Sequence, residues 1–139
     1  MIRKLLVGAV GGAVLVGAVL QLWGTNLPRT TTAERTAELS APVSEVYRLV
    51  TDVNGQAGWR SDVSQIQLSA SGSAWEEHTK DGSVLTFHVL RKKADSLFII
   101  SYSSTTGFEG RWKGTFVPTS RGTRVRFIET VTIPNPLIR

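Results

Sequence analysis

The sequence predicts an α+β domain, in which a curved antiparallel sheet carries a short helix after its first strand, preceded by one N-terminal transmembrane helix. Three observations predict this. Residues 5–23 form one uncharged apolar run, one segment after residue 42 has helical periodicity, and the remaining chain alternates like strands between turn signals. The length of 139 residues allows one domain of ordinary size and excludes a multidomain enzyme.

The apolar run begins at Leu5 and ends at Trp23, with one polar side chain and no charge. As a helix it would be roughly 28 Å long, close to the hydrocarbon thickness of a bilayer. Arg3 and Lys4 precede it, so the positive-inside rule predicts a cytoplasmic N-terminus and an extracytoplasmic domain. We interpret residues 1–24 as a retained single-pass anchor, and a cleaved signal peptide is the alternative.

Gly8 and Gly12 within the anchor have the GxxxG spacing that lets two transmembrane helices pack closely. A homodimer through this helix is therefore one interpretation, and chance spacing in a segment rich in glycine and alanine is the other. Residues 25–36 are polar, contain a proline and have no clear period, which predicts a linker. The folded domain is then expected over residues 37–139.

The helix of the domain is expected to begin near Ser40, whose hydroxyl can cap it, with Pro42 in the first turn. An apolar stripe follows at helical spacing, and Asn54 with Gly55 is expected to end the helix. The first strand is expected at residues 35–39. The other strands are expected at 64–69, 74–79, 84–91, 96–103, 110–117 and 123–133, joined by short turns into an antiparallel meander.

Alternation along the strands assigns the side chains to two faces. In the last strand Val125, Phe127 and Val131 share a side with Glu129, so this side must face the core. The same counting places Glu77 beside Trp75 on the inner side, so two carboxylates lie among apolar side chains. The inner set further includes Leu85, Phe87, Val89, Trp112, Gly114 and Phe116, and the outer set includes Thr86, His88, Arg111, Lys113, Arg124 and Arg126.

Several segments together resemble the SRPBCC, or START-like, superfamily: the N-terminal apolar run, SAPVSEVYRLVTDV, GWRSDV, the Trp75-x-Glu77 strand and IETVTIPNPLIR. The likeness is closest to its membrane-anchored bacterial members, often described as polyketide cyclase/dehydrase or lipid-transport-like proteins, and covers about residues 37–139. It implies a helix-grip fold, in which the sheet curls around a long C-terminal helix and leaves an apolar cavity. Members bind lipids, sterols, polyketides or other apolar ligands, and some catalyse cyclisation or dehydration.

The sequence departs from that family at its end. The resemblance implies a long C-terminal helix after residues 135–139, and the sequence stops there. We interpret the domain as C-terminally incomplete, with the C-terminal helix absent. The alternative is that another chain or a membrane surface covers the inner face.

Eight residues are the candidate ligand-binding set: Trp59, Arg60, Trp75, Glu77, Phe87, Trp112, Phe127 and Glu129. The aromatic members could line an apolar pocket, and core packing would explain them equally well. Glu77 and Glu129 are the candidate catalytic residues, because burial raises the pKa of a carboxyl and suits it to acid–base work near neutral pH. The alternative is that an arginine such as Arg60 or Arg139 neutralises each of them.

Composition excludes several classes of function. The absence of cysteine excludes disulfides, thiolate nucleophiles and iron–sulfur clusters. The net charge of +5 falls to +3 without the two cations before the anchor, which is too small an excess to indicate nucleic-acid binding. His78 and His88 are the only histidines, lie on the outer face and have no third ligand at a useful spacing, so we expect no metal. No nucleotide, hydrolase or other cofactor motif occurs, so no cofactor is expected.

The outer face is expected to bring Lys113 near Arg126, with Arg111 and Arg124 close by. Anionic phospholipid head groups would offset the repulsion between these cations, and a solvated basic face is the alternative.

The sequence thus favours a membrane-anchored domain that binds or transfers a small hydrophobic ligand or lipid without transforming it. One alternative is a cyclase or dehydratase that uses an inner-face carboxylate, with Arg60 and Tyr102 as the polar groups that could join it. The other is an interaction module whose groove is filled by a partner. Whether the protein is an enzyme is left open, with a non-catalytic role preferred.

Overall fold

The structure is a computed structural model that describes residues 28–135, and the anchor expected over residues 1–24 lies outside this range. Within it, no helix is both long and apolar enough to span a bilayer. The described elements are the strands β1 (Thr30–Leu39), β2 (Val63–Leu68), β3 (Ala74–Thr79), β4 (Val84–Lys93), β5 (Leu97–Ser104), β6 (Glu109–Thr119) and β7 (Gly122–Thr132), and the helices α2 (Val43–Thr51) and α3 (Val53–Gln56).

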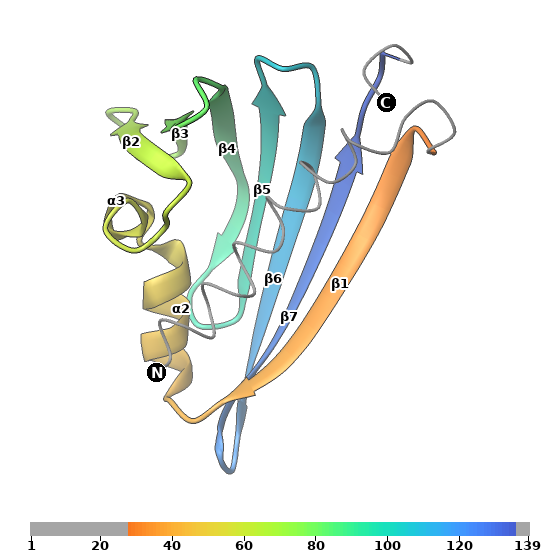
Figure 1. Cartoon of the computed structure of the whole chain (residues 1–139). Helices are drawn as coiled ribbons and strands as arrows, with labels where there is room; N and C mark the ends of the chain where they lie inside the picture. Colours follow the sequence, from red (N-terminus) through yellow and green to blue (C-terminus); the bar gives the residue numbers. More distant parts are fainter. Residues whose placement is uncertain (1–27, 136–139) are drawn as a thin grey trace.

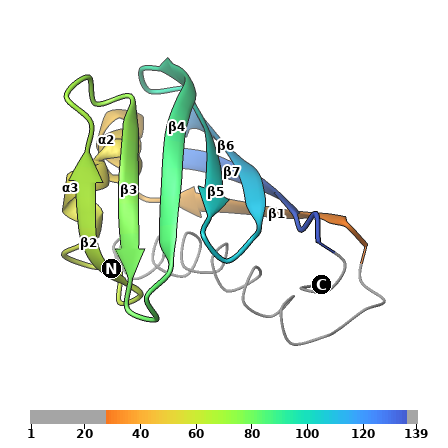
Figure 2. The ribbon, with the colours of Figure 1, turned by 90° about the horizontal axis from the view of Figure 1, so that it is seen from above.

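The seven strands form one antiparallel sheet in the order β1-β7-β6-β5-β4-β3-β2 (Figure 1). β2 to β7 follow one another as a meander, and β1 pairs with β7 from Thr30 opposite Thr132 to Leu39 opposite Thr123. The sheet is strongly bent. Seen from above, β2 to β4 run across the direction of β1 and β7 (Figure 2). The predicted curved antiparallel sheet is confirmed.

β1 is longer than expected, since it begins at Thr30 and not at residue 35. Residues 30–36, assigned to the linker, are therefore strand. The error has a physical reason: the inward positions Thr31, Ala33 and Arg35 carry no large apolar group, so the hydrophobic alternation that marks a half-buried strand is missing. The strand forms because it pairs with β7 along its whole length.

The helical segment is divided into two helices. Val46, Tyr47 and Val50 of α2 are buried, as the apolar stripe predicts. The predicted cap is wrong, because Pro42 occupies the N-cap position and no side chain caps α2. The predicted end is also wrong: the Asp52 side chain accepts a hydrogen bond from the Gly55 N–H at 3.2 Å and so caps α3.

The faces of the sheet are those predicted by alternation. On β6 and β7 the inner positions Trp112, Phe116, Val125 and Phe127 are buried, whereas the charged outer positions between them are exposed. α2 packs against the inner face, where the rings of Tyr47 and Phe116 meet edge to face at 5.1 Å. One hydrophobic core therefore lies between the concave side of the sheet and the helices.

The register of the outer face places Lys113 opposite Ile128 and Arg126 opposite Thr115. The two cations are thus diagonal neighbours on this face, near each other as expected but not directly opposite. Arg126 instead pairs with Glu34 of β1, at 2.6 Å from Nε to Oε1 and 3.0 Å from Nη2 to Oε2. Glu34 lies in the part of β1 that was assigned to the linker, and it neutralises part of the positive charge expected for this face.

Candidate functional site

A cavity of about 80 Å³ lies within the core, between the concave side of the sheet and the two helices. A cavity of that size is large enough for several water molecules or a small ligand group. The wall is predominantly apolar and aromatic. It is formed by Val50, Gln56, Arg60, Trp75, Glu77, Leu85, Phe87, Phe98, Ile100, Tyr102, Phe108, Trp112 and Glu129.

Six of the eight predicted ligand-binding residues line this cavity: Arg60, Trp75, Glu77, Phe87, Trp112 and Glu129. The other two do not. Phe127 is buried next to Trp112, with ring centroids 4.9 Å apart. Trp59 is half-buried in the connection between α3 and β2, where the next residue, Arg60, is the one that reaches the cavity.

The lining also contains residues absent from the predicted ligand-binding set. Leu85 was placed on the inner face, and the alternation that identified it applies equally to Phe98 and Ile100 on β5. Gln56 and Phe108 lie outside the strands, in α3 and in the turn before β6, where no periodic pattern marks them. Tyr102, considered only as a possible polar partner, is part of the wall.

The aromatic walls follow from strand register. Trp75 lies directly opposite Phe87 in the β3–β4 pair, and their rings stack at a centroid distance of 4.8 Å. The Tyr102 ring is 5.4 Å from Phe87. Gly110, opposite Tyr102 on β6, makes room for that ring, because a β-carbon at Gly110 would overlap it. The glycine thus lets the tyrosine ring lie across β6.

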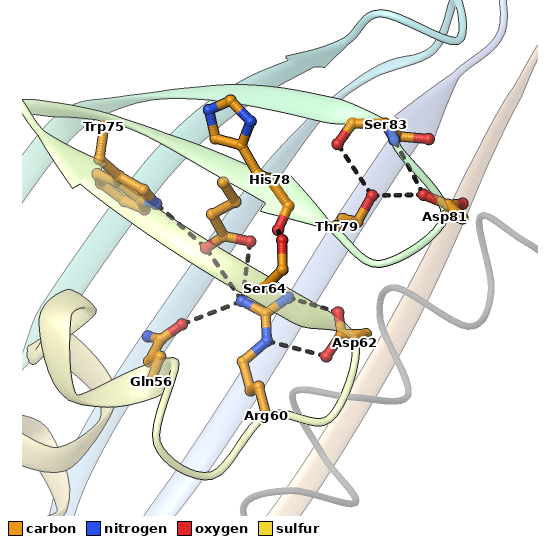
Figure 3. A network of polar contacts seen from close by, with 10 residues as sticks. Gln56, Arg60, Asp62, Ser64, Trp75, His78, Thr79, Asp81 and Ser83 are labelled. Atoms are coloured by element: carbon orange, nitrogen blue, oxygen red, sulfur yellow. Dashed lines mark hydrogen bonds and ion pairs between the residues drawn. The ribbon is translucent and has the colours of Figure 1, made fainter.

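One polar region of the cavity wall is centred on Glu77, whose side chain is 1% exposed. Nη1 of Arg60 donates to both carboxylate oxygens at 3.0 Å, and the Trp75 indole N–H donates to Oε1 at 3.1 Å (Figure 3). Arg60 also binds Asp62 at 2.8 Å and Gln56 at 3.1 Å. Glu77 is therefore neutralised by Arg60, as the structural alternative predicted.

Burial affects the two partners of this ion pair differently. Burial raises the pKa of Glu77, and the Arg60 guanidinium and the Trp75 N–H offset that effect only in part. Burial alone would lower the pKa of Arg60, but the charges of Glu77 and Asp62 and the hydrogen bonds to them outweigh it and raise the pKa. The group ties the α3–β2 connection to β3, which is a structural role.

The other polar region contains Glu129, which is 7% exposed. The Tyr102 hydroxyl donates a short hydrogen bond to Oε1. Oε2 is buried and has no hydrogen-bond partner among the described residues, and no arginine or lysine among them forms an ion pair with Glu129. Arg139, considered above as a partner, lies outside the described residues. The two inner carboxylates thus have different surroundings.

Burial raises the pKa of Glu129 to about 7, against a smaller lowering by the Tyr102 hydrogen bond. The pKa of Tyr102 is raised by its own burial and by the Glu129 charge, so the phenol keeps its proton. A carboxyl that titrates near neutral pH beside an apolar cavity can accept a hydrogen bond, hold a charge or exchange a proton.

Metal binding has no candidate centre in residues 28–135, where no group of three or more potential His, Asp or Glu ligands comes together. His88 is exposed on the outer face of β4. His78 is half-buried on the outer side of β3, with Nε2 at 3.8 Å from Oε2 of Glu76.

The chain is similar to a protein family and to solved structures. The family model for polyketide cyclase/dehydrase and lipid transport matches residues 30–139. A START superfamily protein from Mycobacterium smegmatis aligns at a TM-score of 0.65 with 14% identity, over 76% of this chain and 79% of that one. A protein from Chromobacterium violaceum aligns at 0.60 with 21% identity, over 78% and 82%.

The di-domain ARO/CYC protein StfQ of the steffimycin biosynthetic pathway aligns at a TM-score of 0.65 with 13% identity, over 75% of this chain and 37% of StfQ. At these identities the likeness to solved structures establishes the fold alone. A comparison with curated protein sequences finds no match.

Proposed function

Because the chain belongs to the polyketide cyclase/dehydrase and lipid transport family, we propose that its domain holds or transfers a small hydrophobic molecule in the aromatic cavity without transforming it. The observation that carries the proposal is the composition of the cavity wall. Apolar and aromatic side chains dominate it, and only a few polar groups reach it, which is the usual make-up of a site for an apolar ligand.

Anchoring in a membrane is part of the proposal. The apolar run at residues 5–23 is long enough to span a bilayer, and Arg3 and Lys4 before it favour a cytoplasmic N-terminus with the domain outside the cytoplasm. Hydrophobic ligands partition into bilayers, so a tethered cavity would stay close to its ligand. Gly8 and Gly12 support helix dimerisation, and cross-linking of the full chain in membranes, with and without Gly12→Leu, tests it.

The experiment that tests ligand binding is extraction of the purified full chain followed by mass spectrometry of the bound molecules. Ile100→Trp places a large ring in the cavity, at the price of about 1–3 kcal/mol of overpacking. Val117→Trp, on the exposed outer side of β6, is the matched control. We expect a hydrophobic molecule with wild type and the control and much less with Ile100→Trp. Equal amounts in all three, or a stable complex with another protein in place of a ligand, would contradict the proposal.

A second candidate is a cyclase or dehydratase in which Glu129 acts as general acid or base. The specific observation in its favour is a carboxyl with a pKa of about 7 and an unengaged oxygen at the cavity. Glu129→Gln separates the two functions. A carrier would gain no new bound molecule from the change, whereas an enzyme would exchange its product for unreacted substrate.

A further inference from the structure

Oε2 of Glu129 is the one carboxylate oxygen of the cavity lining without a hydrogen bond among residues 28–135. Glu77, the other carboxylate of the lining, uses both of its oxygens. Glu129 lies opposite Trp112 on β6 and Ala33 on β1, and neither side chain offers a donor toward it. An unsatisfied buried acceptor at a cavity is costly unless a ligand supplies the donor.

The charges around the cavity determine what kind of donor fits. Among residues 28–135, Arg60 is the only cation in the lining, and it is engaged by Glu77 and by Asp62. These three groups carry one net negative charge, to which an ionised Glu129 adds another. The basic residues of β6 and β7 are exposed on the outer face, away from the cavity. The cavity is therefore complementary to a positive charge, and it disfavours an anion.

The aromatic rings of the lining strengthen this preference. Tyr102 is in edge contact with Phe108 at a centroid distance of 6.3 Å, and Phe98 is in edge contact with Trp112 at 6.2 Å. All four residues line the cavity that Glu129 also lines. The face of an aromatic ring attracts a cation, most strongly where water is excluded. Such rings can therefore contact both the apolar part of a ligand and an ammonium group on the same ligand.

We propose that the cavity selects an apolar molecule bearing a protonated amine, whose N–H donates to Oε2 of Glu129 while Tyr102 holds Oε1. The inference rests on the proposed function, because it names the class of ligand for the same cavity. A neutral alcohol can make the hydrogen bond but leaves the buried charge uncompensated. A carboxylate of the same shape adds a like charge. The amine provides both the donor and the opposite charge.

The test uses three probes of similar size: 2-phenylethylamine, 2-phenylethanol and 3-phenylpropionate. The full chain is placed in phosphatidylcholine nanodiscs and titrated by calorimetry at pH 8, and empty nanodiscs correct for partition into lipid. We expect the amine to bind ~10-fold or more tightly than the alcohol, since a charge-assisted hydrogen bond is about twice as strong as a neutral one. The carboxylate should bind most weakly.

Glu129→Gln should abolish the preference for the amine, because the amide carries no charge to attract an ammonium group and its oxygen still accepts from Tyr102. Glu109→Gln is the matched control: it removes the same charge from an exposed position of β6 and should keep the preference. Equal binding of amine and alcohol by the wild type overturns the inference and needs no variant. If the amine and the alcohol bind equally and a hydrophobic molecule still co-purifies with the full chain, the proposed function stands. If no probe binds and no hydrophobic molecule co-purifies, the inference and the proposed function are both rejected.

Discussion

Glu129→Gln should make the stability of the protein less dependent on pH. The carboxyl has a pKa of about 7 in the folded protein, against 4.5 for the ordinary group that the unfolded chain exposes. Between these values the folded state keeps a proton that the unfolded state releases. The contribution that favours folding is therefore complete below pH 4.5 and is lost as the pH rises through about 7.

The size of the effect follows from the two pKa values. Their difference corresponds to about 3 kcal/mol of unfolding free energy once the pH is well above 7. Glutamine fills nearly the same volume, accepts the Tyr102 hydrogen bond and cannot ionise. Relative to Glu129→Gln, the wild type should therefore lose about 2–3 kcal/mol between pH 5 and pH 8.5.

Urea unfolding of the full chain in phosphatidylcholine nanodiscs, followed by tryptophan fluorescence at several pH values, measures this difference. The control is Glu109→Gln, which removes an exposed carboxylate of β6. A plot of its unfolding free energy against pH should run parallel to that of the wild type. If the difference between wild type and Glu129→Gln stays constant from pH 5 to pH 8.5, burial does not control the charge of Glu129 and the reasoning is refuted.

Three further outcomes are expected. Glu77→Gln should destabilise the domain by about 1.5–3 kcal/mol in urea unfolding at neutral pH, because the buried guanidinium of Arg60 loses its hydrogen bonds to a charged acceptor and keeps only Asp62 as a charge partner; a loss below 1 kcal/mol would contradict the structural role. Gly110→Ala should cost about 1–3 kcal/mol in the same assay, since the new β-carbon overlaps the ring of Tyr102, and an unchanged urea midpoint would argue against that packing. The protein has no native cysteine, so Ala94→Cys should react with a membrane-impermeant maleimide in intact cells while Ile2→Cys should not, and the reverse pattern would invert the proposed topology.

Alternation was sufficient to predict which side of most strands is buried. On β6 and β7 all the aromatic residues fall on one set of alternate positions, so one register alone buries them, and Trp112 and Phe127 lie inside as counted. The same rule failed for β1, where threonine, alanine and arginine occupy the inward positions. That strand is specified by its pairing with β7, which depends on residues almost a hundred positions away.

The sequence predicted most of the residues of the candidate site, but not all of the contacts between them. An inner carboxylate must find a compensating group, which correctly indicated Arg60 for Glu77. For Glu129 the sequence offered Tyr102 only as one of two polar groups that could join an inner carboxylate, because Tyr102 reaches Glu129 across β6, past Gly110. Such contacts depend on the register of three strands at once, and side-chain chemistry along one strand carries no information about them.

The pairing of β1 with β7 also determines the order in which the sheet can be completed. Ribosomes release β1 first and β7 last, so the meander of β2 to β6 can assemble hairpin by hairpin while the first strand waits without a neighbour. Thr30 and Thr132, which meet at the end of that pair, are separated by 102 positions along the chain. Closure over so long a loop is slow and leaves strand edges open to wrong partners during synthesis, so recently translated chains should depend on chaperones until residue 132 has emerged.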